Sequence, residues 1–123
     1  MAVTYSTTLK NTRMTDVVTA IGSTGVLEIG TASMASVLAT IALDATAGTV
    51  TSGILTFSSF PKSDTSADAT GTAAAARIRT ASGGTDVITG LTVGTSGSNI
   101  NLDSLSITAG QTVTINSATI THG

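Results

Sequence analysis

The stretch from Gly71 to Val93 reads GTAAAARIRTASGGTDVITGLTV, and it decides the fold class. Two runs of alternating residues flank the turn sequence Ser82-Gly83-Gly84, and alternation with a period of two is typical of β-strands. A two-residue loop that contains glycine is a common connection between such strands. The stretch therefore predicts an antiparallel β-hairpin with one buried face.

The position of the loop fixes the register of this hairpin. With Ser82 and Gly83 as the loop, Ile78 faces Val87 and Arg79 faces Asp86. That register pairs apolar residues on one face and opposite charges on the other. A loop one residue later would set Arg79 against an isoleucine, so we predict the first register.

Composition indicates a thin core and a weakly charged surface. Hydrophobic residues make up 41% of the 123 residues, but the chain has one Tyr, two Phe and no Trp. Valine, isoleucine, leucine and alanine must therefore form the core, and small side chains bury less area each. Serine and threonine supply about a third of the chain, while charged residues supply 10%, against about 25% in typical domains.

The same numbers disfavour several partners. Five Lys and Arg residues and a net charge of −2 form no basic stripe, so we expect no nucleic-acid binding. The chain has no cysteine, which excludes disulfides and thiolate metal sites. The start of the chain lacks the pattern of a signal peptide and no apolar run is long enough to span a membrane, so we expect synthesis in the cytoplasm and no membrane partner.

Residues 1–22 are expected to form an N-terminal arm and helix, and residues 23–123 a β-sandwich, within a single domain overall. Leu9, Met14, Val17, Val18 and Ile21 recur at helical spacing. A hydroxyl side chain among residues 6–8 suits the N-cap, and Gly22 suits the C-terminal end. Whether this helix packs on its own domain or on a partner stays open; in the second case Leu9 and Arg13 are candidate contacts.

The remainder reads as about eight short strands separated by glycine-containing turns. This spacing predicts a mainly β protein, an antiparallel, jelly-roll-like β-sandwich with a short N-terminal helix. Gly53 inside residues 49–58 indicates a bulge or a break. The longest polar connection, residues 59–71, reads as a loop. In residues 112–121 the apolar parity changes near Asn116 and Ser117, which indicates a bulge or a crossing between sheets.

Few residues suit catalysis or metal binding. The single histidine, His122, stands next to the C-terminus, and the single glutamate, Glu28, lies among apolar residues. Asp64 and Asp68 could hold Ca²⁺, but aspartates in such loops more often cap turns. We therefore predict no enzyme activity, no cofactor and no metal.

Contacts with other proteins are the better expectation. Arg77 and Arg79 are the clustered positive charges, and they either pair with Asp86 or meet carboxylates of another subunit. Phe60 and Pro61 follow a predicted strand and are interface candidates in a chain with few aromatic residues.

Several phrases of the chain resemble small virion proteins of tailed bacteriophages. They are the opening TYSTTLKNTRMTDVVTAI and the stretches FPKSDTSADATGTAAAARIRT, DVITGLTVGTSGSNINL and SITAGQTVTI, which begin at Thr4, Phe60, Asp86 and Ser106. Members of this group act as capsid cement or decoration proteins. The resemblance implies a jelly-roll-like sandwich, self-association as a dimer or trimer, and binding to the major capsid protein on the outside of the virion capsid. No motif of the group marks contact residues.

Two other functions remain as alternatives. A tail or fibre component that binds host glycans would need aromatic platforms, and only Tyr5, Phe57 and Phe60 could supply them. An enzyme would need convergent titratable groups, which the sequence does not indicate.

Overall fold

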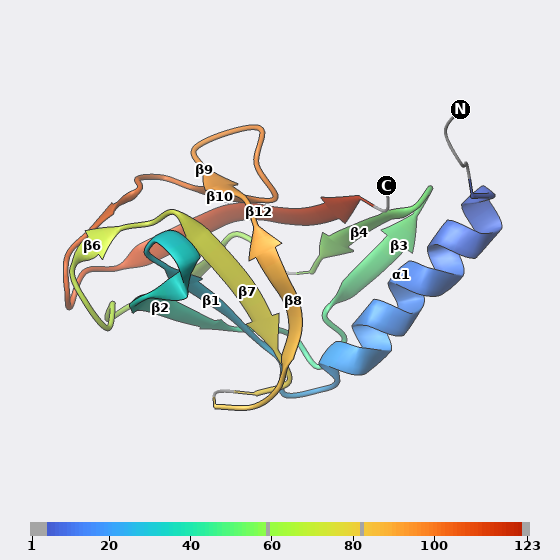
Figure 1. Ribbon diagram of the computed structural model, residues 1–123, viewed down its shortest axis with the longest axis horizontal. Coiled ribbons are helices and arrows are strands. Elements are labelled where there is room, and N and C mark those ends of the chain that lie inside the picture. The colour runs from blue at the N-terminus through green and yellow to red at the C-terminus, as the bar shows by residue number, and fades with distance from the viewer. Residues whose placement is uncertain (1–4, 59, 82, 122–123) are drawn as a thin grey trace.

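The computed structural model describes residues 5–58, 60–81 and 83–121, and within them the protein is mainly β with one helix before the sheets (Figure 1). Two principal sheets, of four and six strands, form a β-sandwich-like arrangement, and a two-stranded ribbon pairs β6 (Gly71–Thr72) with β11 (Ser106–Ile107). The expected fold class is confirmed. The strands are more numerous than predicted, and several of them hold only two or three residues.

The four-stranded sheet has the order β2-β1-β7-β8 and is antiparallel throughout. Its strands are β1 (Val26–Gly30), β2 (Val37–Ala42), β7 (Ala75–Arg79) and β8 (Asp86–Leu91). A short 3₁₀ turn, η1 (Ala32–Met34), lies between β1 and β2. β1 is buried along its whole length, and it lies inside the sheet between β2 and β7.

The central hairpin, β7 and β8, forms as predicted but with a shifting register. Arg79 pairs with Asp86, as expected, whereas Ile78 pairs with Ile88 rather than Val87. The sequence-based register was wrong at this second pair, because β8 carries extra residues at two irregularities. Part of the loop, at Ser82, lies outside the described residues.

The six-stranded sheet has the path β3-β4-β12-β10-β9, with β5 also paired to β12. Its strands are β3 (Gly48–Thr51), β4 (Ile54–Phe57), β5 (Lys62–Asp64), β9 (Val93–Gly94), β10 (Ile100–Leu102) and β12 (Val113–Thr121). All pairings are antiparallel except β9 with β10.

Two irregularities expected in this sheet are present. The register between β10 and β12 shifts so that Asn101 pairs with Ser117 but Leu102 pairs with Ile115, which leaves Asn116 as the bulge residue. The expected break at Gly53 is a tight turn between β3 and β4, where Ser52 and Gly53 both have positive φ. The loop expected over residues 59–71 is partly wrong, because its described part contains β5 and the start of β6.

Helix α1 (Thr7–Ile21) begins and ends close to the expected positions. The Ser6 side chain accepts a hydrogen bond from the Leu9 N–H at 3.2 Å, and Gly22 at the C-terminal end has φ +75°, a conformation that glycine adopts without strain. Met14 and Ile21 belong to the same buried cluster as the sheet residues. The helix therefore packs on its own chain, against β3, β4 and β8.

The core lies between the two sheets and consists of aliphatic side chains. Its largest fully buried members are Ile21, Leu27, Ile29, Leu38, Leu55, Ile78, Ile100, Leu102, Ile107 and Ile115. Phe57 is the one buried aromatic residue in the described chain. No helix in the described residues is long and apolar enough to cross a membrane.

Candidate functional site

A charge cluster occupies the outer face of the four-stranded sheet. Glu28 on β1 is only 5% exposed, and the Arg77 Nε on β7 donates a 2.6 Å hydrogen bond to its Oε1. Nη1 of Arg79 lies 3.8 Å from the same oxygen, and Nε of Arg79 lies 2.9 Å from Oδ1 of Asp86. This last contact lacks the alignment of a hydrogen bond, so it is an ion pair only.

This cluster accounts for both arginines that were candidate interface residues. Two carboxylates, one buried and one 43% exposed, balance the two guanidinium groups. The predicted pair of Arg79 with Asp86 is confirmed, and Glu28 is the partner that the sequence did not reveal. The cluster holds strand β7 against β1 rather than presenting free positive charge.

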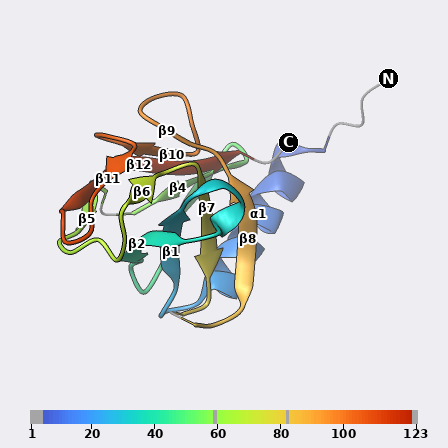
Figure 2. The ribbon, with the colours of Figure 1, turned by 60° about the vertical axis from the view of Figure 1, so that its left-hand side comes forward.

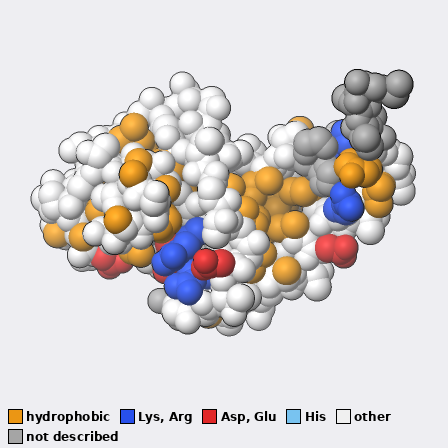
Figure 3. Space-filling view, in the orientation of Figure 1, with side chains coloured by type: hydrophobic (Ala, Val, Ile, Leu, Met, Phe, Trp, Pro, Cys, Tyr) orange, Lys and Arg blue, Asp and Glu red, His pale blue; other side chains and the backbone are white. Residues whose placement is uncertain are grey.

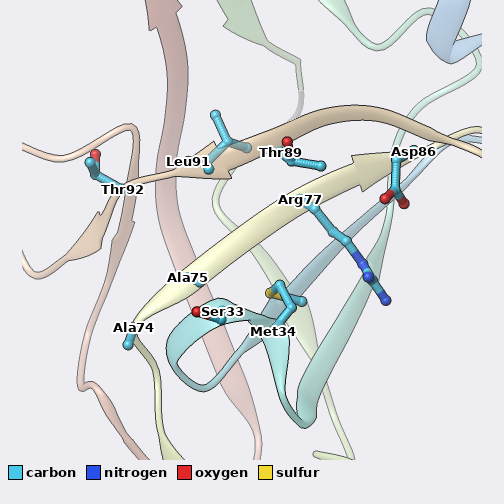
Figure 4. A pocket seen from close by; sticks show the side chains of 10 residues that line it. Ser33, Met34, Ala74, Ala75, Arg77, Asp86, Thr89, Leu91 and Thr92 are labelled. Carbon is cyan, nitrogen blue, oxygen red and sulfur yellow. The ribbon is translucent and has the colours of Figure 1, made fainter.

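A pocket of about 510 Å³ lies beside the cluster, between η1, β7 and β8 (Figure 4). Its lining combines apolar and polar residues: Ser33, Met34, Ala74, Ala75, Arg77, Asp86, Thr89, Gly90, Leu91 and Thr92. Gly90 has φ +73°, which lets β8 bend at the pocket.

The turn at η1 forms one wall of this pocket, and the backbone of this turn is strained. Ser33 and Met34 both have positive φ, which is uncommon for residues with a side chain. The Met34 side chain packs over Gly30, where a Cβ would collide first with the Ser36 carbonyl oxygen and then with the end of the Met34 side chain. Hydrogen bonds between Thr31 and Ser36 close the loop around this turn.

The candidate calcium ligands serve a different role. Asp64 Oδ2 accepts a 3.0 Å hydrogen bond from the Thr40 N–H, and Asp64 Oδ1 accepts one from the Ser66 N–H. The Asp68 N–H donates to the Leu38 carbonyl at 2.7 Å. These bonds cap the outer edge of β2, and no group of three or more potential metal ligands occurs within the described chain.

Leu9 and Arg13, the candidate contact residues of the helix, lie in the first turns of α1. Leu9 is 41% exposed and Tyr5 is 37% exposed. The Arg13 guanidinium stacks over the Tyr5 ring, 4.8 Å from its centroid. Ile54, at the nearby β3–β4 turn, is also exposed, and that turn is tied to the helix by a 2.7 Å hydrogen bond from the Gly53 N–H to Asn11 Oδ1.

Phe60 and Pro61 lie where the chain passes from β4 to β5, joined by a cis peptide bond. The Phe60 ring packs edge-on against Phe57, with centroids 6.5 Å apart, and Phe60 is half-buried while Pro61 is exposed. Lys62 Nζ lies 6.0 Å from the Phe60 centroid and also pairs with Asp44. Phe60 therefore belongs mainly to the edge of the core.

An apolar hollow separates the sheet that ends in β8 from helix α1. Figure 3 shows hydrophobic side chains gathered in this hollow. The bordering elements α1, β3 and β8 carry half-buried apolar residues, namely Val17, Val18, Val50, Val87 and Ile88. We call this surface the α1–β8 hollow. Apolar surface of this kind marks sites of contact with other proteins more often than sites of chemistry.

Comparisons with known protein families, with curated proteins and with solved structures find no match to this chain. The structure therefore carries the functional argument together with the sequence. His122 lies outside the described residues, so its expected lack of a catalytic role stays a prediction.

Proposed function

We propose that this chain is a non-enzymatic structural protein of a bacteriophage virion, a cement or decoration protein that binds the outside of the capsid and stabilises it. Its partners in this proposal are the major capsid protein and further copies of the chain itself. The observation that carries the proposal is apolar surface at two places beside each other, the α1–β8 hollow and the exposed start of α1, with a few charged side chains of the helix between them (Figure 3).

This surface has the character of a protein interface. Tyr5, Leu9 and Ile54 are the large hydrophobic side chains that are exposed in the described chain, and they come from the helix start and the adjacent β3–β4 turn. Interface centres are depleted in charge and enriched in aromatic and arginine side chains. The stacked pair of Tyr5 and Arg13 fits that composition. The resemblance of the sequence to small phage virion proteins supplies the identity of the partner.

A glycan-binding tail component has less support. Phe57 is buried, Phe60 packs against it, and the Arg13 guanidinium stacks over the Tyr5 ring. A sugar platform needs an open aromatic face, and these contacts occupy the three aromatic rings of the chain at least in part.

Heat resistance of phage heads tests the proposal. Undecorated heads are incubated with saturating protein, and the temperature of DNA release is compared with that of bare heads. We expect saturated heads to release DNA at a higher temperature, because binding to the intact shell stabilises it by mass action. Equal release temperatures would contradict the proposal.

A pair of variants locates the surface. Leu9→Lys places a charge on the exposed apolar start of α1, and Thr108→Lys places the same charge at an exposed position directly after β11, on the side of the molecule opposite α1 (Figure 2). We expect the first variant to lose most of the stabilising effect on heads and the second to retain it. Both changes lie at exposed positions, so both proteins are expected to fold.

A further inference from the structure

The two edges of the four-stranded sheet differ in a way that bears on self-association. At one edge, β2 is capped: the Thr40 N–H donates to Asp64 and the Leu38 carbonyl accepts from the Asp68 N–H. At the other edge, β8 pairs with β7 alone in the described part of the chain. Unpaired edge strands are templates for another strand, and proteins usually block them.

The side chains of the open edge carry few of the usual blocks, although β8 has register irregularities at two places. Strand β8 reads DVITGL, with no lysine and no proline, and Asp86 at its start is its one charged residue. In Figure 2, β8 lies at the margin of the four-stranded sheet, with α1 behind it. A strand added beside β8 would therefore extend the sheet over the α1–β8 hollow.

We propose that the β8 edge pairs with the β8 edge of a second copy of this chain, antiparallel and around a two-fold axis. The inference specifies the self-association that is part of the proposed function. Because the β2 edges are capped, pairing of the two open edges closes the assembly at two copies and leaves no edge of this sheet for a fibre.

The charges on β8 are compatible with this pairing. A two-fold axis at Ile88 pairs this residue with its own copy and sets each Asp86 opposite Gly90 of the partner subunit. The two carboxylates then lie about 14 Å apart, at about 3.4 Å per residue, which exceeds the screening length of roughly 8 Å at physiological salt. Like charges therefore do not oppose the pairing.

Strand pairing alone buries too little surface for a stable dimer, which needs about 800 Å² from each partner. The α1–β8 hollow supplies additional apolar surface beside the new strand, and two of the elements that border it carry the half-buried residues Val17, Val18, Val87 and Ile88. The open edge, the hollow beside it and the capped opposite edge thus all favour a second copy of this chain as the partner.

Light scattering of the full-length protein during size-exclusion chromatography tests the proposal over a series of concentrations. We expect a mass twice that of the 12.0 kDa chain at high concentration. Thr89→Lys places two like charges next to the two-fold axis, so we expect the dissociation constant of the dimer to rise about tenfold or more. Thr49→Lys makes the same change at an exposed position of β3, the edge strand of the other sheet, and is expected to leave the dimer intact.

Hydrogen exchange of the unaltered protein gives a second readout that needs no variant. The amides of residues 86–91 are expected to exchange more slowly as protein concentration rises, whereas those of β3 stay unchanged. A monomer at all concentrations, a trimer, or a dimer that Thr89→Lys leaves intact without protection of β8 would overturn the proposal.

Binding experiments with phage heads distinguish a failure of the β8 pairing from a failure of the proposed function. A dimer that does not bind heads contradicts the cement function and leaves the β8 pairing supported. A monomer whose β8 amides become protected only on heads overturns the pairing, because the added strand then comes from the capsid protein.

Discussion

The buried carboxylate of Glu28 is expected to contribute more to stability than the exposed carboxylate of Asp86, although both contact the same arginine. The test is Glu28→Gln, which keeps the shape of the side chain and removes its charge. Breaking a fully buried ion pair costs about 3–5 kcal/mol, and a hydrogen bond to a charged group contributes about 1.5–3 kcal/mol. Arg77 and Arg79 are about one fifth exposed, so water compensates in part.

We therefore expect Glu28→Gln to lower the free energy of unfolding by about 2 kcal/mol, which corresponds to a fall in Tm of roughly 8 °C for a chain of this size. The matched control is Asp86→Asn, whose carboxylate is 43% exposed and whose loss should cost about 0–1 kcal/mol. Denaturant titrations monitored by circular dichroism, at one protein concentration, measure both values. A cost below about 0.5 kcal/mol for Glu28→Gln, or equal costs for the two variants, would refute this account of the cluster.

Two further substitutions test how the β3–β4 turn is held on the helix. Asn11→Ala removes the acceptor of the Gly53 N–H and should cost about 1–2 kcal/mol, measured by denaturant titration; Thr12→Ala on the same helix should cost little, and equal effects would contradict the docking role of Asn11. Gly53→Ala adds a Cβ at φ +76° and 3.1 Å from the Lys10 side chain, so its Tm should fall further than that of Gly97→Ala, which has φ +71° and open space around it. A Gly97→Ala variant as unstable as Gly53→Ala would show that the contact with Lys10 adds nothing.

Local patterns in the sequence predicted the parts of the fold that depend on neighbouring residues. The helix bounds follow from apolar spacing, the Ser6 cap and Gly22. The bulge at Asn116 follows from the change of parity in β12. The pair of Arg79 with Asp86 follows from the hairpin loop. Each of these features is determined within about fifteen residues of chain.

The remaining features depend on contacts between distant segments. Glu28 meets Arg77 across 49 residues, and Asp64 caps Thr40 across 24 residues, so no local pattern marks either partner. The register of β8 shifts at irregularities that the alternation of residues does not reveal. The contrast between a capped and an open sheet edge depends on the strand order, which the sequence left undetermined.

The proposal that this chain decorates a capsid has one most direct test, which is sedimentation of the purified protein with and without undecorated phage heads. We expect the protein to sediment with the heads and to saturate at a fixed copy number per head, while the unbound protein stays in the supernatant. A protein that remains in the supernatant at every head concentration would contradict the proposed function.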